Sequence, residues 1–111
     1  MPIFDRFDVV SVPFPYTDRP MRQRRPALVV VRAGTRADDR LGMVVMITAA
    51  ENRPWPGDVR LADAQRAGLS IPSVVRPTKI ATIEAVQASR IGSITPAERR
   101  AVRAAIVEIL G

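Results

Sequence analysis

Two polar side chains stand at the ends of apolar segments, where a fold could bring them to one surface. Arg25 precedes Pro26 and the apolar run 27–31, and Thr48 ends a second apolar run over 42–47. Proline disfavours helix at the residue before it, so we expect Arg25 to be extended at the start of a strand that is buried on both faces. A guanidinium can hold phosphate oxygens in a fork of N–H donors, and a nearby threonine hydroxyl can donate one more hydrogen bond. These residues predict a site that binds a phosphodiester.

Structural roles compete with this interpretation. From residue type alone, Arg25 could pair with a carboxylate at the rim of the fold, and Thr48 could be an ordinary turn hydroxyl. Trp55, which is flanked by Pro54 and Pro56, could stack on a nucleobase as aromatic side chains do in single-strand binders. It could equally plug the interior of the fold, and we favour the plug.

Length and composition indicate one small, β-rich domain over residues 1–111. Of the 111 residues, 47% are hydrophobic, which is enough to bury a core. The 10 prolines and 6 glycines favour short strands joined by turns over long helices. The apolar runs are too short to span a membrane, and residues 1–10 lack the apolar core of a signal peptide, so we expect a cytoplasmic protein with no membrane association.

The chain is strongly basic, with 17 basic against 11 acidic residues and a formal net charge of +6. Such an excess favours a polyanionic partner, nucleic acid above all, although the amino-acid usage of a GC-rich genome would also produce it. Clustering favours binding, because the segment 19–40 holds seven arginines and only two acidic residues. Arg19, Arg22 and Arg24 are candidates to hold a phosphate backbone, whereas loop arginines in general are solvated.

Two residue types that carry much enzyme chemistry are missing from the chain. It has no cysteine, which removes disulfides, thiolate zinc sites and cysteine nucleophiles. It has no histidine, so the usual metal ligand and the usual proton shuttle are missing as well. Only carboxylates such as Asp38 and Asp39 could hold a cation, and we expect neither a metal site nor a cofactor.

The pattern of apolar runs and turn residues predicts a mainly β fold. We expect strands over 8–12, 27–31, 42–48, 58–61, 73–75, 79–83 and 91–94, the first two of them forming a hairpin with an arginine-rich tip. Between 62 and 67 we expect one or two helical turns that end at Gly68 in a left-handed conformation.

The last segment has the signals of an α-helix. Thr95 is the expected N-cap, Pro96 takes the first helical position, and Glu98 completes a capping box. A single apolar stripe should pack on the sheet, and Arg99, Arg100 and Arg103 should face solvent. The stripe consists of Val102, Ala105, Ile106, Ile109 and Leu110.

Taken in order, these pieces resemble the MazF/PemK toxins, the ribonuclease halves of bacterial toxin–antitoxin pairs. The resemblance covers nearly the whole chain, and no piece is specific alone. The main shared segments are Asp8-Val9-Val10, Pro13-Phe14-Pro15, Arg25-Pro26-Ala27-Leu28-Val29-Val30, Ile47-Thr48, Arg53-Pro54-Trp55-Pro56-Gly57-Asp58-Val59, Pro72-Ser73-Val74-Val75 and Arg90-Ile91-Gly92.

The resemblance implies a small SH3-like barrel of the CcdB/PemK type with a C-terminal α-helix. It implies a homodimer that cleaves single-stranded RNA without a metal, with Arg25 and Thr48 as the catalytic pair. Attack by the ribose 2′-OH would leave 2′,3′-cyclic phosphate and 5′-OH ends, and DNA would survive. A cognate antitoxin would lay a flexible acidic or apolar segment across the RNA groove. The residues that we assign to RNA binding are Arg19, Arg22, Arg24, Glu51 and Trp55.

Each catalytic role also has a physical basis. The reaction needs a base for the 2′-OH, an acid for the leaving oxygen, and donors for the charge on the non-bridging oxygens. Arg25 suits the last role, because its guanidinium stays protonated, and it could hand a proton to the leaving oxygen. Thr48 would donate one hydrogen bond to the phosphate. The base stays unassigned, with Glu51 and Asp58 as candidates.

Two departures from the family and two alternative functions stay open. Phe7 stands where the family usually has glycine, and Ala81 replaces a common arginine that we expect to serve the dimer or the RNA channel. The alternatives are a CcdB-like poison of DNA gyrase and a relative that binds RNA or antitoxin without cleaving. CcdB-type action is associated with a C-terminal aromatic residue, whereas this chain ends in Ile109-Leu110-Gly111, which favours the nuclease.

Overall fold

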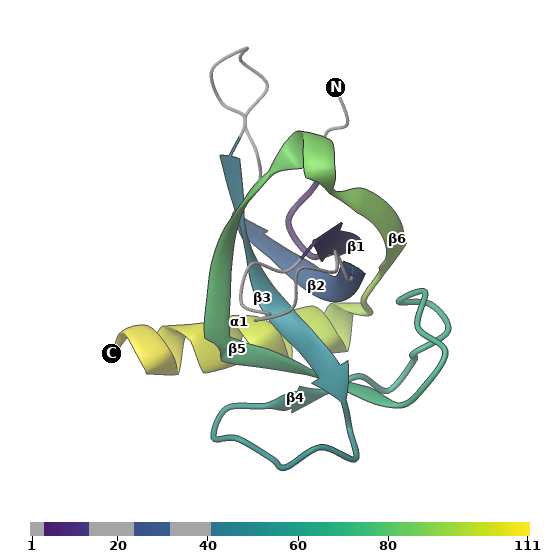
Figure 1. Ribbon diagram of the computed structural model, residues 1–111. Coiled ribbons are helices and arrows are strands. Elements are labelled where there is room, and N and C mark those ends of the chain that lie inside the picture. Colours follow the sequence, from purple (N-terminus) through teal and green to yellow (C-terminus); the bar gives the residue numbers. More distant parts are fainter. Residues whose placement is uncertain (1–3, 14–23, 32–40) are drawn as a thin grey trace.

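A strongly bent antiparallel sheet and one C-terminal helix make up the fold (Figure 1). The computed structural model describes residues 4–13, 24–31 and 41–111. The elements in chain order are β1 (Asp8–Pro13), β2 (Arg24–Val31), β3 (Leu41–Ala49), β4 (Val59–Arg60), β5 (Ser73–Glu84), the 3₁₀ turn η1 (Ala85–Gln87), β6 (Ser89–Ser93) and α1 (Pro96–Leu110).

The strand order β4-β5-β3-β2-β1-β6 leaves β4 and β6 at the two edges of a six-stranded sheet. In Figure 1 the sheet curls so that β5 passes through η1 into β6 on the opposite side, and α1 lies across the strands. The predicted fold class, a small SH3-like barrel with a C-terminal helix, is confirmed.

The central strands are buried on both faces. Successive side chains of a strand point to opposite sides of the sheet, so each strand contributes to two separate buried clusters. On β2, Ala27 and Val29 face one buried cluster and Leu28 faces the other, while Val31 is exposed. The inner cluster consists of Phe4, Val10, Val12, Ala27, Val29, Val44, Met46, Ala81, Ile83, Ala85 and Ala88. The helix-side cluster consists of Phe7, Val9, Leu28, Val45, Ile47, Leu61, Ala67, Val75, Ile94 and Val102. Two-sided burial was predicted for this strand and is confirmed over 27–29.

One long strand replaces the two that we expected over 73–75 and 79–83. β5 runs through Pro77 without a break, and its pairing with β3 shifts there: Met46 lies opposite Arg76, and the adjacent Val45 lies opposite Ile80. The three residues between Arg76 and Ile80 therefore form a bulge. A proline has no N–H to donate to the ladder, so a bulge accommodates it where a regular strand would not.

The helix begins as predicted but packs differently along its length. Thr95 and Glu98 form the capping box, with Pro96 in the first turn. Val102 is fully buried and Ile106 packs, partly buried, against the helix-side cluster, whereas Ile109 is 42% and Leu110 79% exposed, so the expected stripe loses its contact with the sheet at the end of α1. Within the described residues, no helix is long and apolar enough to cross a membrane.

Gly68 ends the helical turns that were predicted over 62–67. Its φ is +77°, its N–H donates to the carbonyl of Gln65, and the N–H of Leu69 donates to the carbonyl of Ala64. This pair of bonds is the Schellman arrangement, in which glycine takes the left-handed position. A Cβ at Gly68 would lie 2.2 Å from the carbonyl oxygen of Ile91, so the close contact with β6 also requires glycine.

Phe7 adopts a conformation that disfavours bulky residues. Its φ is +73°, and it is the non-glycine residue with a positive φ among those described. The glycine that the family resemblance places here fits that backbone without strain. In this chain the ring is buried in the helix-side cluster, with the guanidinium carbons of Arg103 at 5.5 Å and Arg99 at 6.0 Å from its centre. Arg99 is therefore half-buried instead of facing solvent as predicted.

Candidate functional site

Strand register brings Arg25 and Thr48 to the same place. β2 and β3 pair antiparallel, with Ala27 opposite Met46 and Leu28 opposite Val45. Continuing this register by two residues sets Arg25 opposite Thr48, and directly opposed residues project their side chains to the same face. The face is the one that carries the inner cluster, since Ala27 and Met46 belong to it. The two residues thus extend the buried core of the barrel to an open end.

Both residues line one pocket of about 450 Å³. Its walls come from the beginning of β2, the end of β3, the segment after the Gly68 turn, and β6. The lining residues include two arginines and no acidic side chain. They are Ser11, Arg24, Arg25, Pro26, Ile47, Thr48, Ala49, Asn52, Gly68, Leu69, Ser70, Ile71, Ser73 and Ile91. Such a lining favours an anionic ligand.

Arg25 has an unused donor. It is half-buried, and its Nε is fully enclosed with no hydrogen-bond partner among the described residues. Over the same described ranges no carboxylate forms an ion pair with it, so the alternative of a pairing at the barrel rim finds no partner there. A buried donor without an acceptor costs about 1 to 3 kcal/mol, which an incoming phosphate oxygen would relieve.

Thr48 is held by a residue that the sequence reasoning did not select. Asn52 Nδ2 donates to Thr48 Oγ1 over 2.7 Å. Asn52 stands four residues later, in the turn that follows β3. Asparagine side chains in turns commonly bond back to nearby polar groups, and this was the available signal.

Arg24 uses its Nε and Nη2 donors within the protein. Its Nε donates to Ser11 Oγ over 3.1 Å, and its Nη2 donates to the carbonyls of Ser11 (2.5 Å) and Gln87 (2.9 Å). The side chain therefore ties β2 to β1 and η1, and it lines the pocket while held in place.

Two described residues that were assigned to RNA binding, Glu51 and Trp55, are not among the lining residues of this pocket. Glu51 and Trp55 lie on the connection between β3 and β4, and both are exposed. Trp55 is 42% exposed and stacks on Arg76, whose guanidinium carbon is 4.4 Å from the ring centre. The expectation that Trp55 plugs the barrel interior is wrong. Arg19 and Arg22 lie outside the described residues.

Asp58, a candidate base, is engaged by Arg76. Arg76 Nε and Nη2 each donate to the carboxylate over 3.0 Å, and the N–H of Trp55 donates to it over 2.9 Å. Burial raises the pKa of Asp58, but the hydrogen bonds from Arg76 and Trp55 and the charge of Arg76 outweigh it, so the pKa is lowered. A carboxylate with a lowered pKa and occupied oxygens is a poor base.

The chain also matches a family of known proteins along most of its length. Residues 5–110 match the family described as PemK-like, MazF-like toxins of type II toxin–antitoxin systems. The chain belongs to this family.

Several solved structures of MazF-like toxins share its fold. MazF from Deinococcus radiodurans has a TM-score of 0.76 at 22% identity, covering 100% of this chain and 99% of that chain. Toxin MazF-mt6 of Mycobacterium tuberculosis has a TM-score of 0.72 at 24% identity, covering 93% and 95%. An endoribonuclease in complex with its cognate antitoxin from a mycobacterial species has a TM-score of 0.70 at 21% identity, covering 96% and 93%. No protein with a curated description matches the chain.

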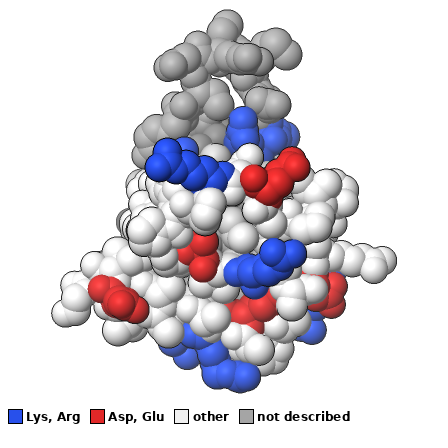
Figure 2. All heavy atoms as spheres, turned by 90° about the horizontal axis from the view of Figure 1, so that it is seen from below, with Lys and Arg blue, Asp and Glu red and all other residues white. Residues whose placement is uncertain are grey.

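On one face of this MazF-like chain the surface charge is mixed. Figure 2 shows basic and acidic side chains interspersed on the face seen from the side of β4. Of the seven arginines between 19 and 40 that suggested a basic surface, only Arg24 and Arg25 are among the described residues. No group of three metal-ligating side chains lies together in the described parts of the chain.

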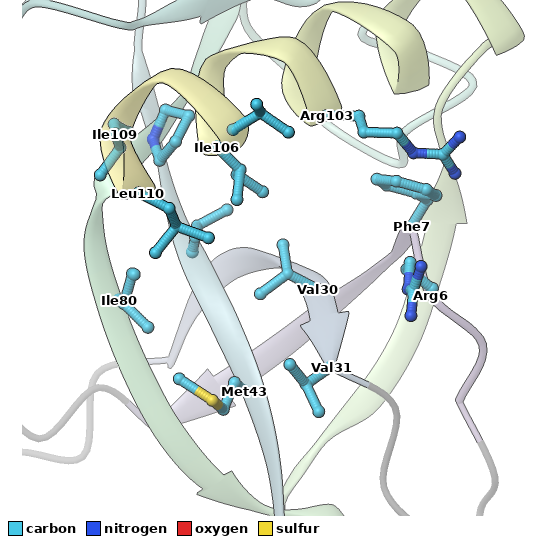
Figure 3. A pocket seen from close by; sticks show the side chains of 13 residues that line it. Arg6, Phe7, Val30, Val31, Met43, Ile80, Arg103, Ile106, Ile109 and Leu110 are labelled. Carbon is cyan, nitrogen blue, oxygen red and sulfur yellow. The ribbon is translucent and has the colours of Figure 1, made fainter.

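A second, apolar groove of about 260 Å³ lies between the end of α1 and the sheet. Figure 3 shows Val30, Val31 and Met43 of the strands facing Ile106, Ile109 and Leu110 of the helix across this groove. Phe7, Arg6 and Arg103 lie at one end of it. Apart from Arg6 and Arg103 at that end, its lining is apolar, so we distinguish it from the Arg25 pocket.

Proposed function

We propose that this chain is the toxin of a type II toxin–antitoxin pair and acts as an endoribonuclease on single-stranded RNA. In this proposal the reaction needs no metal ion and no cofactor. The observation that carries it is the convergence of Arg25 and Thr48 on one pocket whose lining holds no acidic residue.

The proposed reaction is attack of a ribose 2′-OH on the adjacent phosphorus. The O2′–P bond forms as the P–O5′ bond breaks, which leaves a 2′,3′-cyclic phosphate and a 5′-OH end. Arg25 would donate to the non-bridging oxygens as their charge grows, and it could pass a proton to the leaving O5′. Thr48 would donate one further hydrogen bond to the phosphate. Preorganised donors of this kind are worth about 100-fold or more in rate each.

The pocket itself offers no general base. The pocket lining holds neither imidazole nor carboxylate, and Asp58 is occupied by Arg76. Glu51 remains a candidate, on the exposed connection beside Thr48. A mechanism that depends chiefly on charge stabilisation fits this set of residues.

We assign the path of the RNA outside the pocket to the remaining predicted residues. Arg24 lines the pocket, although its Nε and Nη2 are engaged within the protein, and Glu51 and Trp55 would contact nucleotides beyond Thr48. Arg19 and Arg22 would act from the segment between β1 and β2.

The proposed protein partners are an antitoxin and a second copy of the chain. One structural relative is an endoribonuclease in complex with its cognate antitoxin. Ile71 and Ile91 are exposed at the wall of the pocket beside its two arginines, so a segment with apolar and acidic side chains would fit there and block RNA. For the homodimer, the apolar groove at α1 is the more suitable surface.

The direct test is incubation of the purified protein with a long single-stranded RNA in EDTA, followed by analysis of the ends. We expect fragments with 2′,3′-cyclic phosphate and 5′-OH ends, no cleavage of the matching DNA, and a loss of rate of at least about 100-fold in Arg25→Ala. Arg100→Ala is the matched control, because it removes the same charge from an exposed position on α1.

Each other result points to a different function. Intact RNA together with gyrase-dependent DNA breaks would identify a CcdB-like poison. Intact RNA without DNA breaks would identify a relative that binds without cleaving. Cleavage that EDTA abolishes would refute the metal-independent reaction.

A further inference from the structure

The side chain of Asn52 reaches back from a turn to the hydroxyl of Thr48. Its Nδ2 donates to Thr48 Oγ1 over 2.7 Å, and both residues line the Arg25 pocket. This contact is local in sequence, and no other side chain among the described residues is seen to hydrogen-bond to the Thr48 hydroxyl.

The turn that carries Asn52 is fixed at both ends. The N–H of Asn52 donates to the carbonyl of Ala49 over 3.1 Å, which closes the turn after β3. The N–H of Ala50 donates to the carbonyl of Pro72 over 2.9 Å, which attaches the turn to the residues before β5. Thr48 is itself paired opposite Val74 in the β3–β5 ladder. Both partners of the side-chain bond are therefore presented from an anchored backbone.

The hydrogen bond from Asn52 restricts the direction in which the O–H of Thr48 can point. A hydroxyl has one proton to donate and two lone pairs that accept. When Asn52 donates to one lone pair, the O–H of Thr48 must point elsewhere, and the rotation of a β-branched side chain is already restricted. Donation to an oxygen also polarises its own O–H bond, which strengthens the next bond in the chain.

We propose that Asn52 is a positioning residue, which holds the Thr48 hydroxyl as an acceptor so that its proton is presented to the scissile phosphate. This role rests on the proposed ribonuclease function. Asn52 acts through Thr48 and does not itself touch the reacting atoms. Because its side chain is exposed, it contributes to the reaction more than to the stability of the fold.

The test is a double-mutant cycle on the rate of RNA cleavage with enzyme in excess. We expect Asn52→Ala to lower the rate constant at saturation by roughly tenfold, with less than about a twofold change in the half-saturating concentration, since the alignment matters when charge develops. In a Thr48→Ala background the same substitution should have no further effect. In a Thr48→Ser background, which keeps the hydroxyl, the effect should return.

Two further variants separate hydrogen-bond donation from a structural effect. Asn52→Asp has the same shape, but its carboxylate can only accept, so it would accept a hydrogen bond from the Thr48 hydroxyl, turn that O–H away from the phosphate and be at least as slow as Asn52→Ala. Gln65→Ala removes a comparable amide from an exposed position outside the pocket and should cleave at the wild-type rate. The melting temperatures of all these variants should stay within about 3 °C of the wild type.

The possible outcomes are distinct. A wild-type rate in Asn52→Ala, or equal losses in the presence and absence of the Thr48 hydroxyl, would overturn the positioning role and leave the ribonuclease intact. A wild-type protein that leaves RNA whole would overturn the proposed function, and this role with it.

Discussion

Two arginines adjacent in the sequence differ in what their side chains have available. Arg24 donates to Ser11 and Gln87 and so stabilises the contact between β2, β1 and η1. Arg25, on the other side of the strand, keeps an enclosed Nε without a partner in the described structure. The charge of a basic cluster thus does not by itself identify a binding residue. Arg25 combines an enclosed donor without a protein acceptor with a place in the pocket lining, and this combination distinguishes it from Arg24.

The contacts of Asp58 favour a role in stability over a role in catalysis, because its carboxylate is bonded to Arg76. In Asp58→Asn the nearly buried guanidinium of Arg76 loses its counter-charge, so we expect the free energy of unfolding at pH 7 to fall by about 3 kcal/mol. The pKa of Asp58 is lowered in the folded state, so the contribution of this ion pair to stability decreases as the pH falls. The stabilisation is complete above the pKa of Asp58 in the unfolded chain, about 4, and is lost as the pH falls through its pKa in the folded state. Urea unfolding of both proteins between neutral and acidic pH measures this.

A control substitution and an assay of RNA cleavage complete the test of Asp58. Glu108→Gln changes an exposed carboxylate on α1 and should alter stability by less than about 0.5 kcal/mol. RNA cleavage by folded Asp58→Asn should proceed within a few-fold of the wild type, because the oxygens of Asp58 already serve Arg76 and Trp55. A loss of more than about 100-fold in a folded variant would instead make Asp58 the general base.

Element boundaries were predictable where a residue acts locally. Thr95 and Glu98 marked the start of α1, and Gly68 marked the end of the preceding turns, because capping and left-handed φ depend on neighbours in the sequence. The continuity of β5 was not predictable, since Pro77 marks a strand end in most contexts and only the pairing with β3 shows a bulge.

For the candidate site, the sequence indicates residue types but not their geometry. Arg25 and Thr48 were predicted from their positions at strand ends and from the family resemblance. That they stand opposite each other depends on the β2–β3 register, which no local pattern determines. Asn52 and the Arg76–Asp58 pair were missed for a related reason. Each is defined by a partner, four residues away for Asn52 and 18 for Arg76, that only the folded chain identifies.

Glu98 fixes the beginning of α1 to a second element. Its Oε1 accepts from the N–H of Thr95 over 2.7 Å, and its Oε2 accepts from the N–H groups of Ala62 (2.5 Å) and Asp63 (3.3 Å). Thr95→Ala should cost about 1 kcal/mol, as an ordinary cap does. Glu98→Ala should cost about 3 kcal/mol, because it strands N–H groups on both elements.

Hydrogen exchange distinguishes the two roles of Glu98. Residues 62–71 lead into the wall of the Arg25 pocket, so their amides should exchange faster in Glu98→Ala and little faster in Thr95→Ala. Equal exchange in the two variants would mean that Glu98 acts only as a helix cap.

At the scale of the whole molecule, the exposed end of α1 is the least explained surface of a single chain. Val107 is 62% exposed and Leu110 79%, and they border the groove lined by Val31, Met43 and Ile80. A stable interface buries about 800 Å² on each partner, with an apolar centre. This groove supplies such a centre, and Arg6 and Arg103 supply part of a polar rim (Figure 3). A second copy on this face would leave the Arg25 pocket, which has a different lining, open to RNA.

Leu110→Glu tests this placement of the proposed homodimer. Because Leu110 is exposed in the single chain, the substitution should leave the melting temperature of the monomer nearly unchanged, but a carboxylate in an apolar interface is left without a partner. We expect the wild type to sediment as a dimer at about 10 μM and Leu110→Glu to sediment as a monomer, with a dissociation constant raised at least about 100-fold, which corresponds to about 2.7 kcal/mol. Val86→Glu, at an exposed apolar position outside the groove, is the control and should stay dimeric. A dimer that survives Leu110→Glu but not Val86→Glu would move the interface to the η1 side of the barrel.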